Sequence, residues 1–134
     1  MLDEDVPEDI HHAAKNGNMS RLTSLISSTA SLDLQDEGGF TPLHWAAYSG
    51  QSDAVQVLVD AKASLDVKDY DGWTPMHWAA NNGHSGTVQV LIANGATSTI
   101  CDFWGRAPLH LAESNGDTDT ANVLRAAGMN NTEQ

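Results

Sequence analysis

Histidines are the residues of this sequence best suited to metal binding or acid–base catalysis, because imidazole ligates transition metals and titrates near neutral pH. His44, His77 and His110 are spaced 33 residues apart. If this spacing reflects a structural repeat, the three side chains lie on successive units, roughly 8–10 Å apart, the usual distance between packed helices. That is too far to share one ion at ligand distances of about 2 Å. The spacing therefore argues against a shared metal site.

The other histidines offer no better ligand set. His11 and His12 are adjacent, and adjacent residues on a helix point in different directions. No Cys or His pair at a suitable spacing accompanies them, so we interpret them as one half-buried and one solvent-facing residue of a terminal helix. His84 follows Gly83 in a predicted turn. An enzyme or metal protein that uses His11, His12 and His84 remains an alternative, and stoichiometric zinc in the purified protein would support it.

The sequence shows no nucleophile arrangement. Its Ser and Thr residues fall at predicted helix caps and turns, where their hydroxyls bond locally. There is no glycine-rich phosphate loop, and no carboxylate pair is set apart in an apolar environment that would shift one pKa. Cys101 is the one cysteine, which fits a reducing compartment. We therefore expect no catalytic residue, no cofactor and no metal, and we predict that the protein is not an enzyme.

The most informative feature is an internal repeat. The segment TPLHWAA beginning at Thr41 recurs as TPMHWAA at Thr74 and, more loosely, as APLHLAE at Ala107, with a shift of 33 residues each time. Residues 39–71 and 72–104 share 15 identities in 33 positions without a gap. A degenerate earlier copy places Ile10 at the position of Leu43. A fixed period of this length predicts stacked structural units.

Each unit predicts two short helices. Thr41 and Thr74 are suited to cap a first helix, whose first residue is proline, because proline lacks an N–H to lose there. A glycine then supplies the left-handed residue that ends the helix. Ser52 is predicted to cap a second helix with Val55 and Leu58 on its apolar face. The residues of this structural motif are Thr41, Pro42, His44, Gly50, Thr74, Pro75, His77, Gly83, Pro108, His110 and Gly116.

The second helix is followed by a predicted tight turn. Asp36, Asp69 and Asp102 each stand three residues before a glycine, a spacing suited to such a turn. Lys62 and Thr29 occupy the positions at which Gly95 and Gly128 would end the second helix. Two helix ends therefore lack the residue that adopts a left-handed conformation without strain, and we expect lower stability there.

This period and the Thr-Pro-Leu-His pattern resemble the ankyrin repeat family over about residues 5–129. The resemblance implies an all-α solenoid of four stacked units with projecting turns, in which the motif histidines bond around the adjoining turn and the Thr hydroxyl. Ala107 replaces that Thr beside His110, which puts the local network there in doubt. We divide the single domain, 1–134, into an N-terminal capping repeat with an Asp-capped first helix, two full repeats, a C-terminal capping repeat and a frayed tail, at residues 5–38, 39–71, 72–104, 105–129 and 130–134.

The composition restricts the partners. Six Lys and Arg stand against 18 Asp and Glu, for a net charge of −12. Nucleic-acid affinity comes mostly from Lys and Arg displacing counterions, and anionic membrane surfaces would repel the chain. No apolar run approaches the roughly 20 residues needed to cross a bilayer, and no secretory signal is visible. We expect a cytoplasmic or nuclear monomer that binds neither nucleic acid nor membrane.

In ankyrin repeats, turn tips and first-helix faces line a concave groove that holds partners. Carried over to this sequence, that implies the partner-binding residues Phe40, Tyr48, Ser49, Tyr70, Asp71, Trp73, Asn81, Asn82, Phe103, Trp104, Arg106, Ser114 and Asn115. The aromatic residues among them could instead pack against neighbouring turns, and for Trp45 and Trp78 we favour packing between units.

We predict a non-catalytic module that binds a peptide or protein surface in this groove. The acidic surroundings favour a partner that carries Lys or Arg near apolar side chains. An alternative is a regulatory or assembly-factor subunit that inhibits or chaperones an enzyme.

Overall fold

The computed structural model describes residues 9–29 and 31–132, which fold into eight helices. These are α1 (Ile10–Asn16), α2 (Met19–Ser28), α3 (Pro42–Tyr48), α4 (Ser52–Asp60), α5 (Pro75–Asn81), α6 (Ser85–Ala93), α7 (Pro108–Ser114) and α8 (Thr118–Thr132). The proposed boundary residues 5–8 and the tail residues 133–134 lie outside the described part.

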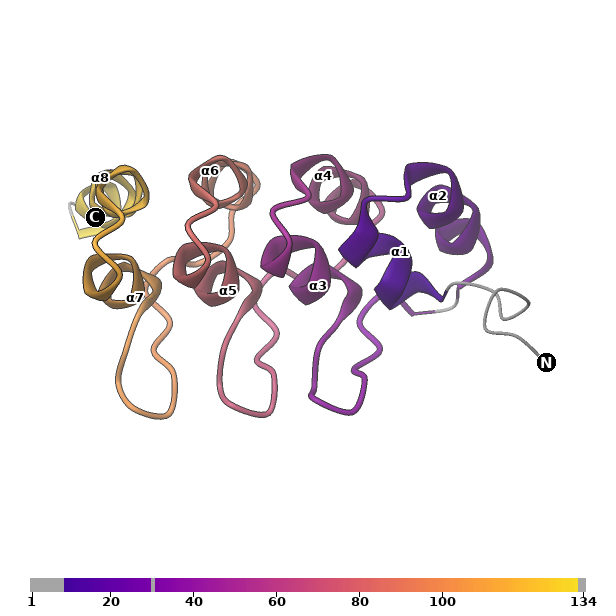
Figure 1. Cartoon of the computed structure of the whole chain (residues 1–134), viewed down its shortest axis with the longest axis horizontal. Coiled ribbons are helices and arrows are strands. Elements are labelled where there is room, and N and C mark those ends of the chain that lie inside the picture. Colours follow the sequence, from indigo (N-terminus) through magenta and orange to yellow (C-terminus); the bar gives the residue numbers. More distant parts are fainter. Residues whose placement is uncertain (1–8, 30, 133–134) are drawn as a thin grey trace.

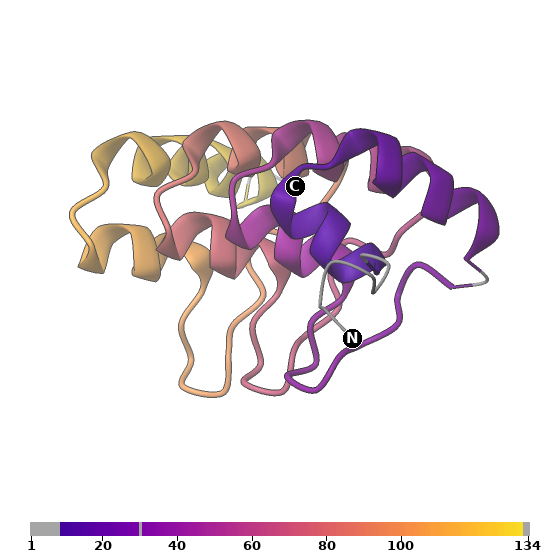
Figure 2. The same ribbon diagram turned by 45° about the vertical axis from the view of Figure 1, so that its right-hand side comes forward.

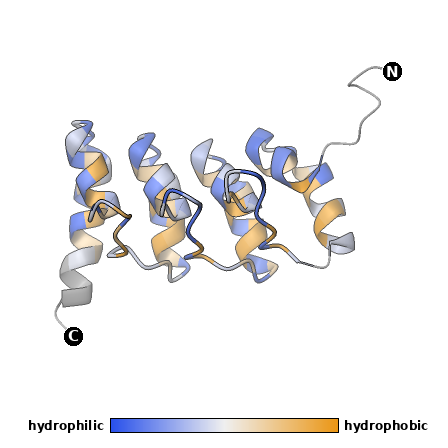
Figure 3. Cartoon of the chain, turned by 90° about the horizontal axis from the view of Figure 1, so that it is seen from below, coloured by the Kyte–Doolittle hydropathy of each residue, from blue (hydrophilic) through white to orange (hydrophobic). Residues whose placement is uncertain are grey.

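The helices form two parallel rows (Figure 1). The first helices α1, α3, α5 and α7 make one row, and the second helices α2, α4, α6 and α8 make the other. Three turns project from the row of first helices on the side away from the second helices (Figures 1 and 2). Viewed from the turns, the helices carry both hydrophobic and hydrophilic stretches (Figure 3). The all-α solenoid predicted from the 33-residue period is confirmed.

The first helices begin as their residue types dictate. Pro42 and Pro75 are the first residues of α3 and α5, and the hydroxyls of Thr41 and Thr74 accept hydrogen bonds from the third helical residue. Asp9 caps α1 in the same way through its carboxylate. Ala107 precedes α7 with the same backbone conformation but has no side-chain cap.

One continuous core joins the units. Leu43, Leu58, Met76 and Leu91 are at most 1% exposed and belong to a single buried cluster. Small buried alanines on the first helices, such as Ala46 and Ala79, allow the neighbouring helices to approach closely. Each unit therefore completes its core only against its neighbours.

The last unit departs from this pattern. Glu113 stands where Ala47 and Ala80 are fully buried in the preceding units. Its carboxylate forms an ion pair with Arg125, the two side-chain atoms lying 2.8 Å apart. Arg125 in turn replaces the half-buried Val59 of an earlier unit. A charged pair thus occupies the surface on which a further unit would stack.

Three predictions about the second helices are wrong. Ser52 is the first residue of α4 and not its cap, because Gln51 holds the cap position and the Ser52 hydroxyl bonds Thr87 Oγ1 instead. Gly128 does not end α8, which continues to Thr132, so residues 130–132 are helical and not a frayed tail. A single glycine costs a helix only about 1 kcal/mol.

The two non-glycine helix ends differ from each other. Lys62 has a φ of 78° and follows α4 in the left-handed conformation that Gly95 adopts after α6. Thr29 instead leaves α2 in an extended conformation, with a φ of −96°. The expected strain is therefore present at Lys62, and the expectation of a left-handed Thr29 is wrong because the first unit leaves its second helix by another path.

Candidate protein-binding groove

Aspartates organise the three projecting turns. Oδ1 of Asp36 accepts hydrogen bonds from the backbone N–H groups of Gly38 and Phe40, both at 3.0 Å. Asp69 and Asp102 accept the equivalent pairs in the next two turns. Neighbouring turns are also linked, since the Tyr70 N–H donates to the Gly38 carbonyl at 3.2 Å. The turns are therefore braced by internal and inter-turn hydrogen bonds.

The second carboxylate oxygen of each aspartate fixes a large side chain. Asp36 Oδ2 accepts the indole N–H of Trp45, and Asp69 Oδ2 accepts that of Trp78, both at 2.8 Å. The last unit has Leu111 at the tryptophan position. Asp102 Oδ2 therefore accepts the indole N–H of Trp73, from the preceding turn, at 2.8 Å.

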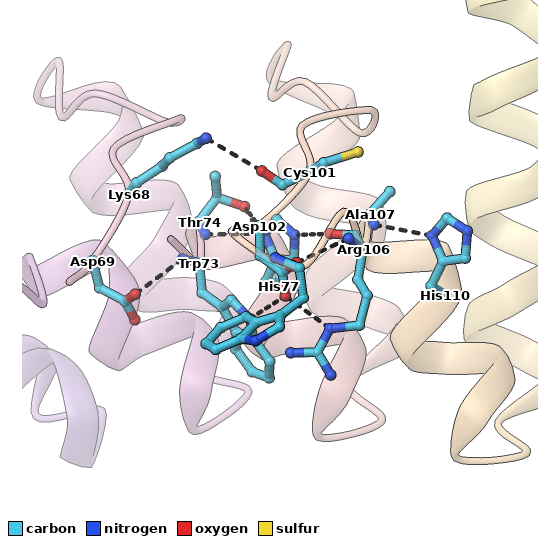
Figure 4. A network of polar contacts seen from close by, with 11 residues as sticks. Lys68, Asp69, Trp73, Thr74, His77, Cys101, Asp102, Arg106, Ala107 and His110 are labelled. Atoms are coloured by element: carbon cyan, nitrogen blue, oxygen red, sulfur yellow. Dashed lines mark hydrogen bonds and ion pairs between the residues drawn. The ribbon is translucent and has the colours of Figure 1, made fainter. Parts of the chain in front are cut away.

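Asp102 also accepts a hydrogen bond from Arg106 Nε at 2.9 Å (Figure 4). Burial alone would raise the pKa of Asp102. The hydrogen bonds from Arg106, Trp73 and the Trp104 backbone more than offset this effect and lower the pKa to about 2. Asp102 is therefore ionised at neutral pH and holds the third turn together.

The motif histidines connect each first helix to the next turn. His44 Nδ1 accepts the Thr41 N–H at 3.0 Å, so Nε2 carries the proton and donates to the Trp73 carbonyl at 2.9 Å. His77 bonds Thr74 and the Arg106 carbonyl in the same way (Figure 4). Burial is the main cause that lowers the pKa of both imidazoles. Both are therefore neutral at neutral pH, and both of their ring nitrogens are engaged in structural hydrogen bonds.

His110 repeats only part of this network. It is exposed, and its Nδ1 accepts the Ala107 N–H at 3.0 Å, as the equivalent histidines accept the threonine N–H (Figure 4). Ala107 has no hydroxyl to contribute the second bond. The doubt raised by the sequence is therefore correct for the hydroxyl bond.

Five aromatic side chains pack together where turns meet first helices. Phe40 contacts Trp45, Tyr48 and Trp78, with ring centroids 4.5, 6.3 and 5.3 Å apart. Trp73 meets Trp78 edge to face at 4.4 Å. We call these five residues the aromatic cluster. Because Trp78 touches side chains of the preceding unit, the cluster bridges the second and third units.

Four of the proposed binding residues carry large exposed aromatic surfaces. Tyr48 is 36% exposed, Tyr70 63%, Phe103 67% and Trp104 65%. Phe40 and Trp73 are half-buried within the aromatic cluster. Asp71 and Arg106, on the same turns as Tyr70 and Trp104, are also exposed.

Two hollows lie along the corner between the turns and the first helices. One, of about 320 Å³, is lined by Asp71, Trp73, Trp78, Trp104 and Arg106. The other, of about 540 Å³, is lined by Asp9, His11, His12, Lys15, Asp36, Glu37, Gly38, Phe40 and Trp45. Both combine turn residues with first-helix residues, and we call the corner that holds them the groove.

Two of the proposed residues at the ends of the first helices link neighbouring units. Asn82 donates from its amide to the Tyr48 carbonyl at 2.9 Å, and Asn115 donates to the Asn81 carbonyl at 2.8 Å. Ser49 is the C-cap residue that follows α3 and is half-buried, whereas Ser114 is the exposed last residue of α7. Asn82 and Asn115 therefore have their amide donors occupied between units.

Comparison with family models agrees with this geometry. A model for ankyrin repeats in three copies matches residues 63–134, and a model for ankyrin repeats in many copies matches residues 10–59. The chain belongs to the ankyrin repeat family. No curated protein matches the chain significantly. Ankyrin repeats generally serve as protein–protein interaction modules and are typically non-catalytic.

Sequence reasoning missed the hollow at the first ankyrin repeat. His11 is 7% exposed, more buried than expected, and its Nε2 lies 2.8 Å from the Leu34 carbonyl. His12 is exposed and pairs with Asp9 at 2.8 Å. Lys15 Nζ lies 5.0 Å from the centroid of the Trp45 ring. The polar residues of the degenerate first repeat were the only sequence signal for this hollow, because it is the fold that brings them beside the turn at Asp36.

Within the described ranges, no three His, Cys, Asp or Glu side chains are grouped as a metal site would require. His84 precedes α6, and its Nε2 lies 3.0 Å from the Tyr48 carbonyl. Across the same described residues, no helix has the length and apolar character to span a membrane.

Proposed function

We propose that this chain is a non-catalytic module that binds a peptide or protein surface in the groove between its turns and first helices. The observation that carries the proposal is the row of exposed aromatic rings on braced turns. Tyr70, Phe103 and Trp104 are each more than 60% exposed, although a turn of this kind needs no aromatic residue at its tip. Aromatic side chains are common anchors of protein interfaces.

The charge of the chain favours a basic partner. With a net charge of −12, the protein attracts Lys- and Arg-rich surfaces and repels acidic ones. Glu37 and Asp71 are exposed on the turns that line the groove. Raising the salt concentration should therefore slow association with the partner, because salt screens exposed charges.

The test is affinity capture from native extract with matched variants. Tyr48→Ala and Trp104→Ala remove exposed rings from the groove, whereas Gln89→Ala changes an exposed side chain on the outer helix α6. A partner retained by the wild-type and Gln89→Ala proteins but lost with both groove variants supports the proposal. Retention by all four proteins would refute binding through the groove.

A further inference from the structure

The hollow between the second and third projecting turns has walls of unusual composition. Three of the four tryptophans of the chain, Trp73, Trp78 and Trp104, line it together with Asp71 and Arg106. We call it the tryptophan hollow. Its volume is about 320 Å³, which suits a single long side chain of a partner rather than a whole helix or strand.

The tryptophan rings already hold one cation. The guanidinium carbon of Arg106 lies 5.8 Å from the centroid of Trp73 and 5.3 Å from that of Trp104. Both distances are within the range of favourable cation–π contact. Both rings therefore lie within cation–π distance of a single guanidinium.

The charge that Arg106 brings is already balanced. Its Nε lies 2.9 Å from Asp102 Oδ2, and the Asp102 side chain is fully buried beneath it. Asp71, by contrast, is exposed and forms no ion pair with any residue in the described part of the chain. The uncompensated charge at the tryptophan hollow is therefore negative. An anionic ligand would face Asp71, whereas a cationic one would pair with it.

We propose that the tryptophan hollow receives an arginine side chain of the partner, and that Arg106 competes with it for the tryptophan rings. This proposal rests on the proposed function and specifies one contact within the groove. The partner guanidinium stacks on Trp73 or Trp104 and pairs with the Asp71 carboxylate. Arginine suits the site better than lysine because its flat, weakly hydrated cation combines stacking with carboxylate pairing.

The probe is N-acetyl-arginine amide, titrated into the folded protein while the indole N–H signals are followed by NMR. N-acetyl-citrulline amide, which has nearly the same shape without the charge, is the control. We expect arginine to bind at least about fivefold more tightly than citrulline, with the largest shifts at Trp73 and Trp104. Equal binding of citrulline, or equal binding of N-acetyl-lysine amide, would overturn the proposal.

Matched variants locate the site. Trp104→Ala should abolish the preference for arginine, and Asp71→Asn should weaken it. Leu34→Ala removes an exposed apolar side chain ahead of the first turn, outside the tryptophan hollow, and should leave binding unchanged. If Leu34→Ala reduces arginine binding as much as Trp104→Ala does, the assignment to this hollow is wrong.

Arg106→Ala tests the competition. Its backbone N–H and carbonyl still bond Asp102 and His77, so we expect the fold to persist and arginine binding to strengthen by about threefold or more. Arg106→Gln, which keeps the aliphatic stem, serves if the alanine variant melts early. Weaker binding by a folded variant would contradict the competition. Failure of these titrations leaves the capture experiment with Tyr48→Ala intact, so the two proposals fail separately.

Discussion

Lys62 is the residue at which one substitution should stabilise the protein. It follows α4 with a φ of 78°, and the N–H groups of Lys62 and Ala63 bond the Val59 and Leu58 carbonyls. Gly95 has a φ of 95° and makes the equivalent bonds after α6. The Lys62 side chain is exposed and, within the described part of the chain, forms no hydrogen bond or ion pair. Its cost is therefore conformational.

The magnitude follows from two opposing effects. A non-glycine residue costs about 1–2 kcal/mol in the left-handed region. Glycine loses about 0.5–1 kcal/mol through its greater freedom in the unfolded chain. We expect Lys62→Gly to raise the free energy of unfolding by about 0.5–1 kcal/mol, which corresponds to a rise in Tm of about 2–4 °C for a domain of this size.

Chemical denaturation followed by circular dichroism measures the change. Lys62→Ala is the control for charge, because alanine keeps the Cβ and should give little of the gain. Gly95→Lys is the reciprocal control. A Cβ at Gly95 would meet no atom within 4 Å, so its predicted loss, about 0.5–1 kcal/mol from the same two effects, has no steric part. Equal stabilisation by Lys62→Ala and Lys62→Gly would refute the conformational explanation.

Three other predictions concern the stability and the assembly of the repeat fold. Ala107→Thr should restore the missing cap of α7 and stabilise the protein by about 1 kcal/mol, because Ala107 shares the backbone conformation of Thr41; an unchanged Tm would show that the position cannot use a hydroxyl. The free energy of unfolding should fall as the pH drops below about 6.5, because His44 and His77 then bind protons in the unfolded chain but stay neutral where they are buried in the folded protein. The loss approaches about 1.4 kcal/mol per pH unit for each histidine until its folded pKa is reached, and equal urea midpoints at pH 7.5 and 5.5 would contradict it. Replacing the Glu113–Arg125 pair by Ala and Val, as in the inner units, should expose an apolar end and promote dimers, which sedimentation would detect; a strictly monomeric variant at high concentration would count against the pair as a cap.

The helix boundaries and the stacking of units could be predicted from the sequence because the rules that set them are local. A Thr-Pro pair begins a helix, a glycine with positive φ ends it, and the 33-residue period requires the copies to stack. The shared core of Leu43, Leu58 and Met76 follows from those rules. Ser52 misled the prediction because its hydroxyl has a partner 35 residues away, at Thr87, which no local rule describes.

The groove was less predictable because its contacts join different units. The indole of Trp73 bonds Asp102 only because Leu111 leaves that carboxylate available. Asn115 looked like a groove residue, yet its amide donates to the Asn81 carbonyl of the preceding unit. The sequence could name the variable positions, but only the fold separates exposed rings such as Trp104 from those that brace the stack.

Site-specific photocrosslinking distinguishes binding in the groove from binding on the outer helices. A photoreactive benzoylphenylalanine in place of Phe103, on the groove, is compared with one in place of Gln89, on the outer helix α6. We expect the captured partner to crosslink efficiently through position 103 and not through position 89. Crosslinking through position 89 alone would place the partner on the opposite face and refute binding in the groove.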